Sequence, residues 1–231
     1  MGSHFSQEKP TTIQELFNQI APRYDFANSL LSAGMDTFWR RYVARQVARW
    51  KPKTVLDVAT GTGGLAEEIK RRIPNCRVFG ADFCIPMLLR AQNRGLVDLV
   101  VSDGLALPFD NATFDVVTVA FGIRNMASIK DALEEMHRLL RPGGHGLVLD
   151  FSLPAPPLQS PYRFYLHHIL PKVAGFVTGR PEAYEYFGDS IETFPKGSVM
   201  LERFASAGFD NRTAALLSFG IVTVYTGQKL G

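Results

Sequence analysis

The sequence contains little cysteine, no long apolar run and no strong excess of charge. Cys76 and Cys84 are the only cysteines in 231 residues and lie in ordinary elements, so we expect no disulfide framework and a reducing compartment. No segment stays apolar over the roughly 20 residues that a membrane-spanning helix needs. A formal net charge of +3 is too mild to indicate a nucleic-acid partner. These absences favour a cytoplasmic globular protein that binds no nucleic acid.

The sequence also lacks a histidine and cysteine cluster with metal-ligand spacing. His167 and His168 are neighbours, so they point to different faces of the helix expected around them. We therefore expect no metal site. Internal repeats and low-complexity tracts are absent as well.

The length and composition predict a single folded unit. With 46% apolar residues, a chain of 231 residues can bury a sizeable core. The opening MGSH resembles the remnant of an expression tag, so we expect residues 1–10 to form a disordered start. Residues 11–231 would form one domain, in which 11–50 are a helical lid and 153–194 an inserted helical cap.

Strand-like and helix-like patterns alternate through the middle of the chain. Strands are predicted at residues 54–58, 77–81, 98–101, 114–121 and 146–151, and helices between them at 65–72, 85–93 and 129–140. This alternation is typical of a parallel sheet with helices on both faces. Strands at 209–217 and 221–226, joined at Ser218-Phe219-Gly220, would close the sheet as an antiparallel hairpin. We thus predict an α/β, doubly wound, mostly parallel sheet of about seven strands.

Helices are expected at both ends of this alternating region. One is predicted over 11–20, and a strongly amphipathic one over 36–50. The second should bury one apolar face, formed by Phe38, Tyr42, Val43, Val47 and Trp50. Four prolines within 153–161 predict a bend, and helices would follow at 161–176, 181–191 and 196–207.

The stretch VLDVATGTGGLAEEI (55–69) places glycines between a buried strand and a helix. Glycine there indicates either a tight connection or the close approach of a ligand. Ligands of doubly wound sheets bind outside the carboxyl ends of the strands. Ala66 replaces the third glycine of a G-x-G-x-x-G pattern, so a pyrophosphate-bound ligand is disfavoured. Asp82 ends the second strand and could accept both hydroxyls of a ribose.

Further residues suit an adenine ring. Asp103 follows the third strand and could accept the exocyclic amine, while Gly104 would let the ring lie close. Phe83 and Met87 could pack on the two faces of the ring. The alternatives are that Asp103 only caps a turn and that Phe83 and Met87 belong to the core.

Longer stretches resemble a known enzyme family. DVATGTGG, GADFCIPML, SDGLALPF, FDVVTVAFGIRN and LRPGG are similar to class I S-adenosylmethionine-dependent methyltransferases. More narrowly, RYDFANSLLSAGMDTFWRR, AFGIRNM, LRPGGHGLVLDFS, YEYFGDSI and AGFDN…SFGIVTVYTGQK resemble the menaquinone and ubiquinone biosynthesis C-methyltransferases, over about residues 12–229. The resemblance implies a Rossmann-like fold, S-adenosyl-L-methionine as methyl donor and a polyprenyl quinol as acceptor. Demethylmenaquinol is the first expected acceptor, and the ubiquinol precursor the second.

The resemblance also assigns residues to the two substrates. Around the donor it places Asp57, Gly61, Thr62 and Gly63 at the methionine part, Asp82 at the ribose, Asp103 and Gly104 at the adenine, and Ala120 beside the sulfonium. Facing the acceptor it places Tyr24, Asn28, Phe121, Arg124 and Asn125.

Several positions depart from the family pattern. The chain has Ala27 for the usual Met, Asp36 for His, Gly64 for Asp, Asp103-Gly104 for Asn-Ala, Ala120 for Ser and Asp150 for Glu. None of these changes removes the donor site. Asp36 leaves no imidazole at its position, and Ala120 removes a hydroxyl that could contact the donor.

The chemistry of a quinol sets the requirements of the acceptor side. A ring carbon becomes a good nucleophile once a neighbouring hydroxyl, with a pKa of about 10, has lost its proton. Arg124 stays protonated, so we assign it phenolate stabilisation, directly or through a water that moves the proton. Asn125 would orient that water, and Tyr24 and Asn28 would close the site. The alternatives are a surface ion pair for Arg124, a helix cap for Asn125 and lid packing for Tyr24.

The sequence is also compatible with further interactions and with two alternative functions. Residues 161–176 are aromatic and flanked by Arg163 and Lys172, which would suit a peripheral membrane contact or a groove for the quinol tail. A homodimer is also compatible with the sequence. The alternative functions are methylation of another small apolar or phenolic acceptor, and a non-catalytic donor-binding accessory subunit of quinone synthesis.

Overall fold

The computed structural model describes residues 29, 32, 34–173 and 181–231. The expected helix over 11–20 and the expected disordered start lie outside the described residues. So does the end of the segment 161–176.

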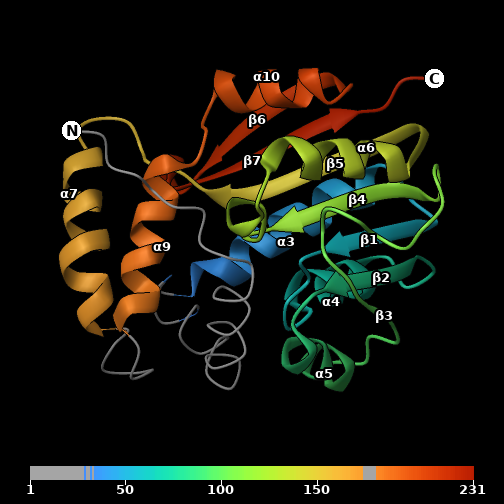
Figure 1. Cartoon of the computed structure of the whole chain (residues 1–231), viewed down its shortest axis with the longest axis horizontal. Helices are drawn as coiled ribbons and strands as arrows, with labels where there is room; N and C mark the ends of the chain where they lie inside the picture. Colours follow the sequence, from blue (N-terminus) through green and yellow to red (C-terminus); the bar gives the residue numbers. More distant parts are fainter. Residues whose placement is uncertain (1–28, 30–31, 33, 174–180) are drawn as a thin grey trace.

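A seven-stranded sheet forms the centre of the molecule, with the order β3-β2-β1-β4-β5-β7-β6 (Figure 1). The strands are β1 Thr54–Val58, β2 Arg77–Asp82, β3 Asp98–Val101, β4 Phe114–Ala120, β5 Leu140–Phe151, β6 Asp210–Leu217 and β7 Val222–Gln228. The first five run parallel, and β7 pairs antiparallel with both β5 and β6. The predicted fold class is therefore confirmed, including the antiparallel hairpin at the end of the chain.

Helices cover both faces of this sheet. The helices on one face contribute their apolar stripes to one core cluster, and those on the other face contribute theirs to a second. One cluster joins the sheet to α6 and α10, and the other joins it to α3, α4 and part of α5. The bounds are α3 Met35–Arg49, α4 Gly64–Arg72, α5 Ile85–Asn93, α6 Ile129–Leu139 and α10 Ser198–Ser206. These bounds lie within two residues of the predicted ones.

The face that α3 buries differs from the predicted face. Trp39, Val43, Ala44 and Val47 are buried, whereas Phe38 is 47% exposed and Trp50 is only half-buried. The reason is a specific partner for Trp39. Its Nε1 donates a hydrogen bond to Ser218 Oγ (2.8 Å) in the turn between β6 and β7, and its ring contacts aromatic side chains at the ends of β4 and β5.

Strand β5 starts at Leu140, earlier than the predicted residue 146. The Pro142-Gly143-Gly144 segment, which precedes the predicted start of the strand, lies within it. Its pairing with β4 is irregular there: Phe114 is opposite Leu140, but Val116 is opposite His145. Such a bulge admits extra residues without ending a strand.

The segment after β5 folds over the carboxyl ends of the strands. It comprises α7 Gln159–Phe164, the π-helical turn η3 Tyr165–Ile169 that directly follows it, and α9 Pro181–Thr193. Helices α7 and α9 stand side by side in Figure 1. A small cluster of Leu153, Leu166, Leu170 and Ile191 holds them together. Phe151 at the end of β5 and Phe187 of α9 pack against it, so this cluster is joined to the sheet.

Candidate active site

Two strand-end turns meet where β1 and β4 lie side by side. From β1 the sheet continues to β2 on one side and to β4 on the other, so the carboxyl ends of β1 and β4 form its topological switch point. Ala59 after β1 and Phe121 after β4 both have positive φ, at 51° and 60°. A side chain on Gly122 would approach Ala59 Cβ to 2.5 Å, so the two turns are in close contact. Strained backbone of this kind clusters at ligand-binding sites.

The glycines of the turn after β1 have different reasons to be glycine. Gly61 and Gly63 both have positive φ, at 56° and 81°. A Cβ on Gly63 would lie 2.5 Å from Leu96 Cδ1 and 2.9 Å from Ala91 Cβ, so this glycine is required by packing. A Cβ on Gly61 would meet nothing within 4 Å, so this position faces open space. Gly61 is therefore the turn residue at which a ligand can approach the backbone.

Asp57 lies beneath this turn, and the residue is 1% exposed. The hydroxyls of Thr60 and Thr118 donate to its two carboxylate oxygens, at 2.8 and 2.7 Å. Burial raises the pKa of Asp57 to about 6, although both hydroxyl bonds act to lower it. The carboxylate thus supports the turn from below, and Thr62 beside it is buried as well.

Asp82 connects the end of β2 to the same turn. Its Oδ2 accepts from the Gly61 N–H and its Oδ1 from the Cys84 N–H, both at 2.8 Å. Burial raises the pKa of Asp82, while these backbone donors lower it. Each carboxylate oxygen can accept a second hydrogen bond, so Asp82 could still accept ribose hydroxyls.

The predicted adenine-binding residues lie further along the same edge. Asp103 is exposed, and its Oδ1 accepts a hydrogen bond from the Leu105 N–H group at 3.0 Å, as the turn-cap alternative expects. This bond uses only one of its two carboxylate oxygens. A Cβ on Gly104 would lie 2.9 Å from Met126 Cε and 3.2 Å from Val58 Cγ1, so a side chain there would have to displace the flexible end of Met126. Phe83 is half-buried, and Met87 is buried beside Cys84, as the core alternative expects.

Arg124 forms a buried ion pair at the ends of β4 and β5. It lies in the 3₁₀ turn η2 Ile123–Asn125, and its Nη1 donates to Asp150 Oδ1 and to the Phe121 carbonyl oxygen, both at 2.6 Å. The side chains of Arg124 and Asp150 are only 5% and 0% exposed. Arg124 is therefore not in the surface ion pair considered as an alternative. In the sequence Asp150 stands out only as a departure from the family pattern. An acid near the end of an apolar strand could have indicated a functional residue.

Aromatic rings cover the guanidinium group of Arg124. Its central carbon lies 4.7 Å from the ring centroid of Phe187 and 5.4 Å from that of Phe151. Tyr162 of α7 is close enough for the Arg124 charge to lower its pKa, against a larger rise caused by burial. The rings hold the guanidinium group in place and exclude water, and charges interact more strongly in such a dry environment.

The remaining acceptor residues are described unevenly. Asn125 is half-buried in η2, and α6 is capped by Ser128, whose Oγ accepts from the Asp131 N–H at 3.2 Å. The cap considered as an alternative for Asn125 is thus made by Ser128. Ala120 and Phe121 are half-buried at the end of β4. Tyr24 and Asn28 lie outside the described residues.

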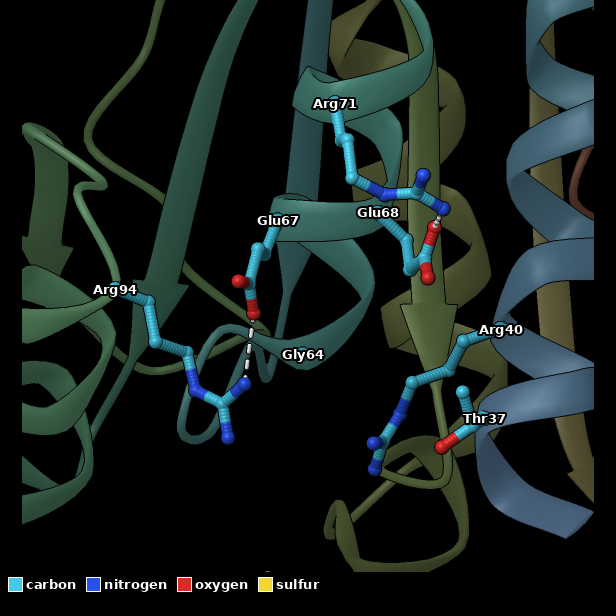
Figure 2. Close-up of a pocket in the computed structure, with 7 residues that line it drawn as sticks. All are labelled: Thr37, Arg40, Gly64, Glu67, Glu68, Arg71 and Arg94. Carbon is cyan, nitrogen blue, oxygen red and sulfur yellow. Dashed lines mark hydrogen bonds and ion pairs between the residues drawn. The ribbon is translucent and has the colours of Figure 1, made fainter. Parts of the chain in front are cut away.

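A shallow polar pocket lies on the outer side of α4. Arg40 of α3 and Arg94 after α5 extend toward the amino-terminal end of α4 from opposite sides (Figure 2). Arg40 pairs with Asp36 at 2.8 Å, one of the positions that depart from the pattern of the resemblance. A Cβ on Gly64 would lie 2.9 Å from Arg40 Nη1, so a side chain there would displace the guanidinium group. Every other charged side chain that lines the pocket also forms an ion pair, so each arginine of the lining already has a carboxylate partner.

The described residues hold neither a metal cluster nor a membrane-spanning helix. Among the residues that the structure describes, no group of three or more His, Cys, Asp or Glu side chains could hold a metal ion. Within the same ranges, no helix combines the length and apolar character that a membrane crossing requires.

Comparisons with known proteins show the family and the fold of this chain. The model of the ubiE/COQ5 methyltransferase family matches residues 5–229. The demethylmenaquinone methyltransferase of Thermus thermophilus is 44% identical over 222 residues, which cover 93% of this chain and 100% of that protein. The ubiquinone/menaquinone biosynthesis C-methyltransferase UbiE of Geotalea daltonii is 39% identical, covering 96% of this chain and 98% of its own. Among solved structures, a SAM-dependent methyltransferase from Thermotoga maritima has the same fold, with a TM-score of 0.66 at 17% identity over 93% of this chain and 99% of that one.

Proposed function

The chain belongs to the ubiE/COQ5 methyltransferase family, and from that premise we propose that it transfers the methyl group of S-adenosylmethionine to a ring carbon of demethylmenaquinol. The observation that carries this proposal is the position of Arg124. A buried cation under aromatic rings lies at the end of β4, beside the turn that follows β1.

The donor is proposed to lie along the carboxyl ends of β1, β2 and β3. It supplies a methyl group on a positively charged sulfur. Gly61 offers open space at the backbone, Asp82 would hold the ribose hydroxyls, and Asp103 would accept the adenine amine. Asp57 would attract the ammonium group of the methionine part through the turn that it supports. Ala120, at the end of β4, would lie beside the sulfonium.

The acceptor is proposed to lie between the donor and the segment formed by α7, η3 and α9. An aromatic ring of a quinol suits a site bounded by Phe121, Phe151 and Phe187. The Arg124 guanidinium would stabilise the phenolate that forms when a quinol hydroxyl loses its proton. Asn125, Tyr24 and Asn28 remain proposed contacts to the acceptor. Water exclusion by the aromatic rings would strengthen the effect of the Arg124 charge.

The polyprenyl tail requires an apolar route to the site. The outer surface of α7 and η3 exposes Phe164 (56%) and Ile169 (42%), and Val173 follows with 41% exposure. Arg163 and Lys172 lie close to them in the sequence. We propose that this surface contacts the membrane peripherally while the quinol enters. Binding to liposomes with and without a quinone tests this contact, and an absence of binding in both cases contradicts it.

A methyl-transfer assay tests the proposed function. Purified protein and S-adenosylmethionine are incubated with reduced short-tail demethylmenaquinol, and the ubiquinol precursor is used in a parallel reaction. A mass gain of one methyl group on the ring is expected with demethylmenaquinol. Product from the other acceptor alone would move the assignment to ubiquinone synthesis. Donor binding without any product would favour a different acceptor or an accessory, non-catalytic subunit.

A further inference from the structure

The ion pair between Arg124 and Asp150 leaves two buried polar atoms without partners. Within the described part of the chain, neither Arg124 Nε nor Asp150 Oδ2 has a hydrogen-bond partner. Buried polar groups are almost always hydrogen-bonded, so a donor and an acceptor that both lack partners within one ion pair require an explanation. Because Nη1 holds Asp150 Oδ1 and the Nε–H group points to the other side of the planar guanidinium group, the two atoms need separate partners: an acceptor at Arg124 Nε and a proton donor at Asp150 Oδ2.

The pair is also a poor choice for stability alone. Removing two charges from water is costly, and apolar residues of similar volume often stabilise a core as well or better. Both side chains are nearly or fully buried, and aromatic rings cover the guanidinium group. A buried pair with unused hydrogen-bonding capacity is therefore better explained by chemistry than by packing.

Its place in the sheet puts the pair next to the proposed reaction. Asp150 directly follows Leu149, which lies opposite Ala120 in the register of β4 and β5. Arg124 lies in the turn that follows β4, and its Nη1 contacts the carbonyl of Phe121. The unpaired atoms are thus near the strand end at which the methyl group is proposed to be transferred.

We propose that Asp150 is the proton acceptor of the methyl transfer and receives the quinol hydroxyl proton, relayed by water, at its unpaired Oδ2. This inference rests on the proposed function. Arg124 remains protonated throughout and stabilises the phenolate, while Asp150 carries the proton.

The step balances without an oxidant or a reductant. The quinol O–H bond breaks and its proton passes to Asp150. The neighbouring ring carbon then forms a bond to the methyl group, the methyl–sulfur bond breaks, and sulfur keeps the electron pair. Loss of the C–H proton from the methylated carbon to solvent restores the aromatic ring, and the oxygen regains a proton from Asp150. One proton is released overall.

The surroundings of Asp150 suit a base. The pKa of Asp150 is raised, because the effect of burial outweighs the lowering by Arg124 and by the Phe151 N–H group. The carboxylate therefore holds a proton more readily than an exposed aspartate does. The titratable or charged groups that face it are Arg124 from η2 and Tyr225 from β7, with Tyr162 of α7 beyond Arg124. Asp150 acts through a water, so it needs no direct contact with the quinol.

The test uses quinols of graded acidity with the full-length protein. Wild-type turnover of short-tail demethylmenaquinol establishes the proposed function separately. Asp150→Asn should lower kcat by about 100-fold or more on this quinol, and the loss should shrink by about tenfold or more on quinols with electron-withdrawing substituents, because their hydroxyls need less help from a base. An equal loss on every quinol, or no loss, would overturn the inference while leaving the proposed function intact.

Two further variants separate chemistry from folding. Asp115→Asn removes another arginine partner, since Asp115 Oδ1 accepts from Arg141 Nη1 at 2.8 Å near the opposite end of β4, and its effect should not depend on quinol acidity. Asp150→Glu keeps the charge if Asp150→Asn does not fold. It should retain turnover and move the acidic limb of the kcat–pH profile to higher pH, because glutamate has the higher ordinary pKa. A limb that stays at the wild-type pH would assign the proton to another group.

Discussion

Replacing Asp57 with asparagine should stabilise the protein at neutral pH while weakening donor binding. The pKa of Asp57 is raised from 3.8 to about 6 in the folded chain, chiefly by burial. Well below pH 3.8 the carboxyl group is protonated in both folded and unfolded chains. As the pH rises through 6, the folded chain must ionise a buried group, so this contribution to the free energy of unfolding is lost. At about 1.36 kcal/mol for each pKa unit, the loss is about 3 kcal/mol.

Asparagine resembles the protonated carboxyl group, because its oxygen can accept from one threonine hydroxyl and its amide can donate to the other. The difference in unfolding free energy, variant minus wild type, should therefore grow by about 3 kcal/mol between about pH 3.5 and about pH 7. Urea unfolding at a series of pH values measures it, and the subtraction removes the other titrating groups. Isothermal titration with S-adenosylmethionine should show binding weakened by about tenfold or more. A difference that stays constant with pH would refute the assignment of a raised pKa to Asp57.

Three other substitutions test individual contacts. Gly63→Ala should destabilise the chain by about 2–4 kcal/mol in urea unfolding, because the position combines a positive φ with crowding. Gly61→Ala should cost only about 1–2 kcal/mol but should weaken donor binding. Equal effects of the two substitutions on folding would contradict this distinction. Ser218→Ala should lower stability by about 1 kcal/mol because it leaves the Trp39 N–H group unpaired, and an unchanged midpoint would show that this bond contributes nothing. Asp82→Asn should reduce donor affinity by about tenfold or more with little change in kcat at saturating donor, and a selective loss of kcat would be the contrary result.

Most of the central sheet could be predicted because its signals are local. The strands around Leu56 and Val117 are apolar runs bounded by glycine or polar turns, and the helices between them show the helical period. Periodicity alone misjudged α3, because Phe38 and Trp39 both fit an apolar stripe. The choice between them depends on Ser218, a hydrogen-bond partner far away in the sequence.

The ion pair of Arg124 and Asp150 could not be predicted from the pattern either. Each residue is polar at the end of an apolar strand, so each could equally have faced solvent. Their burial depends on Phe187 and Tyr162, which come from a segment with little periodic signal of its own. The donor edge could be proposed from the sequence because glycines and acids at strand ends carry a chemical meaning independent of packing, and its donor contacts stay a prediction.

The order of the last two strands has a consequence for synthesis of the chain. β6 emerges from the ribosome before β7, yet in the described sheet it pairs with β7 alone. The five parallel strands can assemble while β6 still has an unpaired backbone on both edges. A nascent chain halted before residue 222 would therefore expose the edges of both β5 and β6, which is the kind of surface that chaperones bind and that promotes aggregation. The arrival of β7 satisfies the open edge of β5 and one edge of β6 at once.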